Sequence, residues 1–160
     1  MTISVGDKVP DVGIYLVTLD SMEAVKSSSV LGVGKVVLFA VPGAFTPTCS
    51  DFHLPGFVIR GDEIRDKGVD TIACISVNDG FVMQAWAKAQ NVSGEVVILA
   101  DGNGTFTKEV GLTLDGSGFG LGVRSQRYAM LIENGVITDL AVEPGPGLTV
   151  SSAESVLAKL

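Results

Sequence analysis

The sequence predicts an α/β fold in one domain, residues 1–160, with a central mixed β-sheet flanked by helices. Three observations lead to this prediction. Short β-branched apolar runs alternate with helical segments, an Asn-Gly pair separates the last two runs, and 46% of the residues are hydrophobic. Alternating strands and helices produce parallel strands, whereas an Asn-Gly turn produces an antiparallel hairpin. A chain of this length and hydrophobicity can bury one continuous core.

Five segments are expected to be strands, because each is a short apolar run bounded by turn residues. The first run, GKVVLFAV, begins at Gly34 and stops before Pro42, which lacks the N–H group that a strand interior needs. Asn134-Gly135 joins the last two runs as a hairpin. In chain order, the expected strands are 34–41, 69–77, 95–100, 127–133 and 136–142.

Four helices are expected between and after these strands. In the longest of them, residues 48–67, apolar residues recur among polar ones, and a kink or break is expected around Pro55-Gly56. Asn78-Asp79 can cap the second helix, Gly111 closes the third, and Ser151-Ser152 begins the fourth. In chain order, the expected helices are 48–67, 81–90, 105–110 and a final one from the serine pair to Leu160.

The charge balance and the absence of long apolar segments narrow the classes of partner. Lys and Arg number 11 against 18 Asp and Glu, so the formal net charge is −7. Without excess positive charge, neither nucleic acid nor a membrane surface is expected as a partner. The N-terminus MTISVGDKVP lacks a basic segment followed by an apolar stretch, and no apolar run reaches the ~20 residues of a membrane span. We expect a soluble protein made without a secretory signal.

Two cysteines, Cys49 and Cys74, are too few for a disulfide scaffold. This count favours a reducing, cytoplasmic compartment, in which either thiol can be reactive. Cys49 and His53 lie four residues apart on a predicted helix, but two ligands do not close a zinc site. The glycine-rich stretch 116–122 leads into a strand instead of opening a helix, which argues against a dinucleotide loop. We therefore expect neither a metal nor a cofactor.

The stretch PGAFTPTCS, residues 42–50, places Cys49 in the first turn of a predicted helix. A thiol reacts as its thiolate, and an unperturbed cysteine with a pKa of about 8.5 is mostly protonated at neutral pH. Pro47 favours a helix start, so the sulfur is expected near unpaired backbone N–H groups. A helix terminus supplies ~0.3–2 kcal/mol, whereas lowering a thiol pKa to about 6 requires roughly 3.4 kcal/mol. A cation must supply the difference.

Arg124 and Arg127 are the candidate cations, because the chain is poor in basic residues and the pair lies at the beginning of an apolar strand. A guanidinium beside Cys49 would stabilise the thiolate. Thr46 can donate one hydrogen bond and accept another in the same site, and Pro42 can shield the sulfur from water. Each of these residues also has a structural alternative. The arginines can be strand-end charges, the threonine a helix N-cap and the proline a strand terminator.

The spacing Pro42-x-x-x-Thr46-x-x-Cys49 resembles the active-site signature of peroxiredoxins. Its context resembles the atypical type II, or peroxiredoxin 5-like, subfamily over nearly the whole chain, from GDKVPD onward. The resemblance implies a thioredoxin-like fold and thiol-dependent peroxidase activity toward hydrogen peroxide and organic hydroperoxides, with peroxynitrite as a further substrate. The similar stretches are PGAFTPTCS, HLPGF, CISVND, LADGNGTF, GLGVRSQRYAM and VSSAE.

Carried over by position, the resemblance implies that Cys49 is the peroxidatic cysteine, which attacks the peroxide O–O bond and becomes a sulfenic acid. Thr46 would hydrogen-bond the peroxide oxygens, and Pro42 would cover the sulfur. Arg127 would stabilise the thiolate and polarise the O–O bond. Arg124 matches a basic position near the site in relatives, but the resemblance assigns it no specific role in the reaction.

The sulfenic acid must be reduced by a second thiol. Cys74 is the internal candidate, and some type II relatives are proposed to form that disulfide, although its apolar strand TIACISV also fits a small buried hydrophobe. The pairing needs Cα atoms about 4.4–6.8 Å apart and local unwinding of the helix that bears Cys49. Other relatives carry a resolving cysteine where this chain has Val150. That departure favours an external reductant, either glutathione with glutaredoxin or thioredoxin.

His53 shares a helix face with Cys49, where it can tune the site, join a subunit contact or make a structural hydrogen bond. The resemblance implies a homodimer, for which Phe45 and Phe81 are candidate contacts if exposed. The alternative function is a non-enzymatic redox sensor or relay that passes oxidation to a partner protein. The missing Cys-x-x-Cys argues against thiol–disulfide exchange of the thioredoxin kind.

Overall fold

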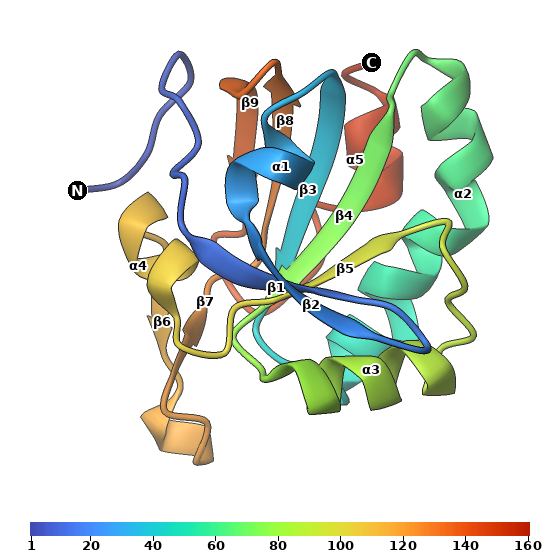
Figure 1. Cartoon of the computed structure of the whole chain (residues 1–160). Coiled ribbons are helices and arrows are strands. Elements are labelled where there is room, and N and C mark those ends of the chain that lie inside the picture. The colour runs from blue at the N-terminus through green and yellow to red at the C-terminus, as the bar shows by residue number, and fades with distance from the viewer.

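The computed structural model describes residues 1–160 and has a seven-stranded mixed sheet at its centre, in the order β2-β1-β5-β4-β3-β8-β9 (Figure 1). The strands are β1 (Gly13–Val17), β2 (Met22–Lys26), β3 (Lys35–Val41), β4 (Thr71–Ser76), β5 (Val97–Ala100), β6 (Thr113–Asp115), β7 (Val123–Ser125), β8 (Tyr128–Glu133) and β9 (Val136–Val142). The helices are α1 (Ser27–Leu31), α2 (Leu54–Asp66), α3 (Gly80–Ala89), α4 (Thr105–Val110) and α5 (Ala153–Leu157), with a π-helical turn η1 (Cys49–His53) and a 3₁₀ turn η2 (Ser117–Phe119).

All five predicted strands are present, and the predicted mixture of parallel and antiparallel pairing is confirmed. Strands β3, β4 and β5 are parallel neighbours, because helices connect them in succession. Strand β8 pairs antiparallel with β3 and forms a hairpin with β9. The hairpin turn uses Asn134 and Gly135 at φ angles of 48° and 83°, the left-handed region that this dipeptide favours.

The sequence interpretation missed the elements before residue 34 and the small β6–β7 ribbon. Strand β1 pairs antiparallel with β5, and β2 pairs with β1 at the edge of the sheet. No residue of β2 is fully buried, so its sequence MEAVK lacks the continuous apolar run used to identify strands. The N-terminal hairpin therefore closes the sheet edge opposite β9, an edge that the sequence interpretation left open.

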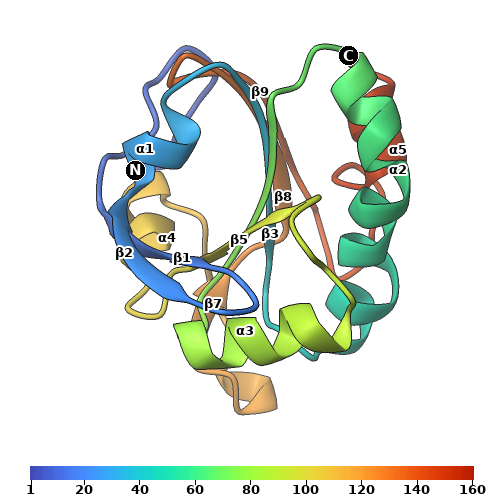
Figure 2. The same cartoon turned by 45° about the vertical axis from the view of Figure 1, so that its right-hand side comes forward.

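Helices cover both faces of the sheet (Figure 2). Helices α2 and α5 lie on one face, and α1 and α4 lie on the other. A cluster of 23 buried residues fills the side of α2, α3 and α5, and includes both cysteines. A second cluster of 15 buried residues fills the opposite side. This two-sided packing gives the predicted central sheet flanked by helices.

The predicted helix over 48–67 is irregular, but the irregularity precedes Pro55. A wide turn, η1, comes first, and the backbone N–H of Leu54 bonds to the carbonyl of Cys49, five residues earlier. Regular α-helix α2 follows, with Pro55 in its first turn. Because proline has no N–H to donate, the hydrogen-bonding register can change just before it. The expected break at Pro55-Gly56 is therefore displaced to the turn that contains Cys49.

The other helices are close to their expected limits. Asp79 caps α3 by accepting a hydrogen bond from the Val82 N–H, and Gly111 ends α4 at φ 72°. Helix α5 ends at Leu157, three residues before the expected end of the last helix. No helix in residues 1–160 combines the length and the apolar character that spanning a membrane requires.

Candidate active site

Cys49 is positioned by the junction between β3 and the helix that follows it. Pro42 comes directly after β3, and helical hydrogen bonding begins with the Ser50 N–H donating to the Thr46 carbonyl at 3.0 Å. Cys49 therefore lies in the first helical turn, where backbone N–H groups lack partners within the helix. This is the placement that the proline spacing predicts.

The connecting loop is held in a defined and partly strained shape. The Ala44 N–H donates to Asn78 Oδ1 at 3.0 Å, which ties the loop to the segment after β4. Phe45 adopts a φ of 65°, a left-handed conformation that costs a residue with a side chain roughly 1–2 kcal/mol. At Gly43 a Cβ atom would lie 2.9 Å from Nη1 of Arg124, so a larger residue would push that side chain away. The sequence Gly43-Ala44-Phe45 is thus fitted to this turn.

A guanidinium lies beside the Cys49 sulfur, as the sequence interpretation required. Arg127, which directly precedes β8, donates from Nη2 to Cys49 Sγ at 3.1 Å. Cys49 is fully buried and Arg127 is 7% exposed. A charge-assisted hydrogen bond is stronger away from water, so the guanidinium is placed to stabilise negative charge that develops on the sulfur. The pairing of β8 with β3 brings the two residues together.

His53 contacts the same guanidinium from one turn further along the helix. Its Nδ1 atom lies 2.8 Å from Arg127 Nη1, and its Nε2 atom lies 2.9 Å from the carbonyl oxygen of Ser151. Burial, with the neighbouring Arg127 charge, lowers the pKa of His53 to about 3. The imidazole is therefore neutral, and because arginine only donates, its Nδ1 must be the acceptor. Of the roles expected for His53, the structure shows the structural hydrogen bond, which the buried imidazole makes at both ring nitrogens.

Thr46 and Pro42 line a cavity of about 760 Å³ beside Arg127. The Thr46 hydroxyl donates to the Gly43 carbonyl at 2.6 Å. Its lone pairs remain able to accept a hydrogen bond from a ligand. The cavity also includes Phe119 and Leu121, so the polar groups of Thr46 and Arg127 lie next to an apolar wall.

Arg124, the second candidate cation, makes no hydrogen bond to Cys49. Its Nε donates to the Leu121 carbonyl at 2.9 Å, and its Nη1 donates to the Pro42 carbonyl at 3.4 Å. Arg124 therefore supports the loop before the helix, and Arg127 is the arginine that contacts the sulfur.

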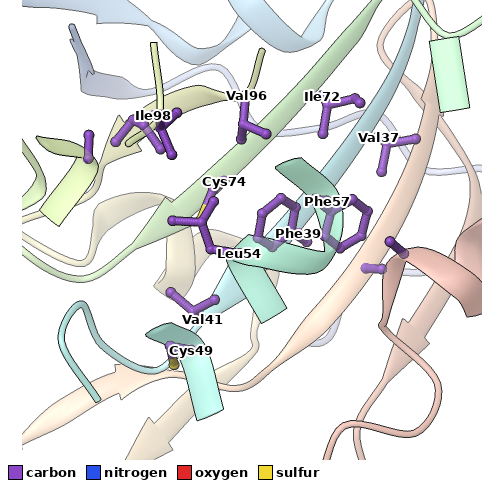
Figure 3. Close-up of a cluster of buried hydrophobic side chains, with 14 of the residues drawn as sticks. Val37, Phe39, Val41, Cys49, Leu54, Phe57, Ile72, Cys74, Val96 and Ile98 are labelled. Carbon is purple, nitrogen blue, oxygen red and sulfur yellow. The ribbon is translucent and has the colours of Figure 1, made fainter. Parts of the chain in front are cut away.

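Cys74 lies in the middle of β4, between Phe39 of β3 and Ile98 of β5 in the sheet register. It is fully buried and free. Burial, with the nearby Cys49, raises the pKa of the Cys74 thiol well above its usual range. Figure 3 shows Cys49 at the end of the buried cluster, beyond Val41, and Cys74 inside it. These surroundings match the small buried hydrophobe that its apolar strand suggested.

Sequence reasoning did not identify Glu143, the residue directly after β9. Its carboxylate accepts hydrogen bonds from the backbone N–H groups of Thr149, Val150 and Ser151 and from two of their hydroxyls. Glu143 is 7% exposed. No local pattern marks it, because its donors come from a turn six to eight residues later. No group of three or more His, Cys, Asp or Glu side chains in residues 1–160 is arranged to hold a metal ion.

Comparisons with known proteins agree with this arrangement. The Redoxin family profile matches residues 4–157. Peroxiredoxin-2E, chloroplastic, of Arabidopsis thaliana is 51% identical, over 99% of this chain and 70% of its own. Peroxiredoxin-2D of the same plant is 48% identical, over 99% and 98% of the two chains. The crystal structure of reduced Prx3 from Vibrio vulnificus with hydrogen peroxide superposes with a TM-score of 0.92 at 50% identity, covering 99% and 96% of the two chains. The chain therefore belongs to the redoxin family, as a thioredoxin-like peroxiredoxin related to the plant type II forms.

Proposed function

We propose that the protein reduces hydrogen peroxide and organic hydroperoxides at Cys49, with an external thiol as the source of electrons; peroxynitrite is a further proposed substrate. Membership of the peroxiredoxins supports thiol-dependent peroxidase activity. The observation that carries the proposal is the 3.1 Å contact between Arg127 Nη2 and Cys49 Sγ in a buried site. The guanidinium there can hold the thiolate and stabilise charge on the oxygens that react with it.

In the proposed reaction, the Cys49 thiolate attacks one oxygen of the hydroperoxide. A sulfur–oxygen bond forms as the O–O bond breaks, and sulfur is oxidised to a sulfenic acid that keeps the hydroperoxide proton. The other oxygen leaves with the bonding electron pair as hydroxide or alkoxide, which takes a proton from solvent to become water or an alcohol. The Thr46 hydroxyl already donates to the Gly43 carbonyl, so it is ready to accept the hydrogen bond of the hydroperoxide O–H. The leaving oxygen develops negative charge, which the Arg127 guanidinium offsets.

The proposed reductant is an external thiol, with glutathione and glutaredoxin first and thioredoxin second. Cys74 is fully buried in β4, where its own thiol is held protonated by burial and by nearby Cys49. This chain has Val150 at the position where the resemblance to peroxiredoxin 5-like proteins implies a resolving cysteine in some members. A sulfenic acid that lacks an internal partner must be reduced by a separate molecule. This mechanism requires a reducing compartment, and we propose a cytoplasmic one.

A steady-state peroxidase assay tests the proposal. The protein is supplied with excess peroxide and, in separate reactions, with glutathione plus glutaredoxin or with a thioredoxin system, and peroxide loss is followed over time. We expect many turnovers with at least one reductant and none in the Cys49→Ser variant. Consumption that stops near one equivalent with every reductant would instead support the sensor or relay function.

We also propose that the protein forms a homodimer. Phe45 is 55% exposed and Phe81 is 74% exposed. The hydrogen bond from the Ala44 N–H to Asn78 Oδ1 holds the loop that contains Phe45 against the segment that precedes Phe81. Exposed aromatic groups on neighbouring loops are typical of protein contacts. Light scattering on wild-type protein and on Phe81→Asp should give the masses of a dimer and of a monomer, respectively; a monomeric wild type would contradict this proposal.

A further inference from the structure

The orientation of Arg127 depends on a second contact. Its Nη2 atom donates to Cys49 Sγ at 3.1 Å, while Nη1 donates to His53 Nδ1 at 2.8 Å. The guanidinium is planar and rigid, so fixing one nitrogen also fixes the direction of the other. A neutral imidazole beside Nη1 therefore positions the N–H group that faces the sulfur.

His53 can play this part in only one tautomer. Its Nδ1 must be unprotonated to accept from Arg127, so its proton must lie on Nε2. The Ser151 carbonyl oxygen lies 2.9 Å from Nε2 and accepts that hydrogen bond. The imidazole is 1% exposed, so water does not compete for either nitrogen. The position of one backbone carbonyl thus selects the tautomer.

The Ser151 carbonyl is held in place by Glu143. The Glu143 carboxylate accepts from the Ser151 N–H at 2.8 Å and from the Ser151 hydroxyl at 2.7 Å. It also accepts from the Val150 N–H at 2.8 Å and from the Thr149 N–H and hydroxyl at 3.0 and 2.7 Å. Five donors on three consecutive residues therefore converge on one carboxylate. Burial opposes its ionisation, but these hydrogen bonds lower the pKa of Glu143 to about 2.

We propose that Glu143 is a positioning residue of the active site, which acts through the Thr149–Ser151 turn and His53 to orient Arg127 toward Cys49. The inference rests on the proposed function and adds a residue that touches neither the sulfur nor the guanidinium side chain. The backbone N–H of Glu143 donates to the Arg127 carbonyl at 2.9 Å, so the carboxylate is anchored next to the strand that presents the arginine.

The indirect route has an electrostatic advantage. A carboxylate in direct contact with Arg127 would offset the positive charge that the thiolate needs. None of the four salt bridges in the structure includes Arg127. The neutral His53 orients the guanidinium without offsetting its charge, and Glu143 uses its own negative charge on five other donors.

The direct test is ¹⁵N NMR of the imidazole in wild-type protein and in Glu143→Gln. His53 is the only histidine, so selective labelling reports on this side chain alone. We expect the wild type to show protonated Nε2 and unprotonated Nδ1, and the variant to show a mixture of tautomers. The rate constant of Cys49 oxidation by hydrogen peroxide should fall about tenfold or more in the variant, because a misdirected guanidinium no longer faces the sulfur and the peroxide. An unchanged tautomer and an unchanged rate in a folded variant would overturn the inference.

Asp101→Asn is the matched control. Asp101 is 2% exposed, and its carboxylate holds the start of α4 through the N–H groups of Phe106 and Thr107 and the Thr107 hydroxyl. Replacing it should lower thermal stability, as replacing Glu143 should, while the oxidation rate and the His53 signals stay at wild-type values. Equal losses of rate in both variants would show that Glu143 acts only on general stability, which would contradict the inference.

A double-mutant cycle with His53→Gln tests the proposed route. If Glu143 acts through His53, adding Glu143→Gln to His53→Gln should cause no further loss of oxidation rate. A full tenfold loss in that background would overturn the route through the imidazole. If Glu143→Gln does not fold, Ser151→Ala removes a single donor and should shift the His53 signals in the same direction. The tautomer measurement needs no peroxide, so failure of the peroxidase proposal is distinguishable from failure of this inference.

Discussion

Cys49 and Cys74 are both fully buried, both free and both part of the same hydrophobic cluster. Cys49 lies in a first helical turn and accepts a hydrogen bond from Arg127 at 3.1 Å. Cys74 lies in the middle of a central strand, among apolar neighbours, and burial raises its pKa. Only Cys49 has a guanidinium beside its sulfur, and a cation at that distance stabilises negative charge on sulfur. A buried thiol becomes a candidate nucleophile through its charged partner and not through its accessibility alone.

The largest expected effect comes from removing the reactive thiol of the two, Cys49. Cys49→Ser should abolish peroxide consumption, because a hydroxyl at this position cannot form the sulfenic acid. The oxygen can still accept from Arg127, so the circular dichroism spectrum and the melting temperature should stay close to wild type. Peroxide loss in the presence of a reductant is the measurement. Undiminished turnover would show that the chemistry lies elsewhere.

The second largest effect comes from removing Arg127, the charged partner that Cys49 has and Cys74 lacks. Arg127→Ala should slow the reaction of Cys49 with hydrogen peroxide about 10²–10³-fold, the usual cost of losing a donor to a developing negative charge. Arg127→Lys is the matched control, because it keeps the charge but cannot bond His53 and the sulfur together. Its rate should lie between those of the other two proteins in stopped-flow measurements. Wild-type rates in Arg127→Ala would contradict the comparison.

Acidification should lower the free energy of unfolding through the surroundings of Cys49, because the only histidine of the chain, the buried His53, lies there. Burial, followed by the Arg127 charge, lowers the pKa of His53 from 6.5 to about 3. Between these values the unfolded chain binds a proton that the folded chain does not, so the free energy of unfolding falls as the pH falls. From about pH 6.5 to about pH 4.5 the loss should be about 2–3 kcal/mol, as measured by urea denaturation. His53→Gln should remove this dependence, and an equally steep loss in the variant would contradict it.

The smallest effect concerns the second thiol. Cys74→Ala should leave the rate of peroxide turnover at its wild-type value, since Cys74 has no part in the proposed reaction. It should lower the free energy of unfolding by about 1 kcal/mol, because the side chain is fully buried and a small cavity replaces its sulfur. Steady-state assays and urea denaturation measure the two quantities. A loss of turnover after the first cycle would instead identify Cys74 as the resolving cysteine.

The elements that bear the two cysteines could be predicted from local sequence. Apolar β-branched runs identified β3 and β4, and the prolines at 42 and 47 marked the strand end and the helix start around Cys49. The contact between Cys49 and Arg127 joins residues 78 positions apart, so it depends on the pairing of β3 with β8. Local patterns do not report such a pairing, and only the family resemblance singled out Arg127 from Arg124.

Strand β2 and the role of Glu143 could not be predicted from the sequence, because both depend on contacts with distant segments. Strand β2 has no buried residue, so it lacks the apolar signal of a strand, and only its pairing with β1 defines it. Glu143 looks like any acidic residue at a strand end. Its importance depends on the turn of residues 149–151 folding back onto it, which is a property of the tertiary structure.

The central claim is that the environment of Cys49, and not that of Cys74, produces a reactive thiol. Brief treatment with one equivalent of hydrogen peroxide, trapping with a sulfenic acid reagent and peptide mass spectrometry test it most directly. The account predicts label on the Cys49 peptide alone, with Cys74 still a free thiol and no bond between the two. Label on Cys74, or a Cys49–Cys74 disulfide as the main product, would contradict it.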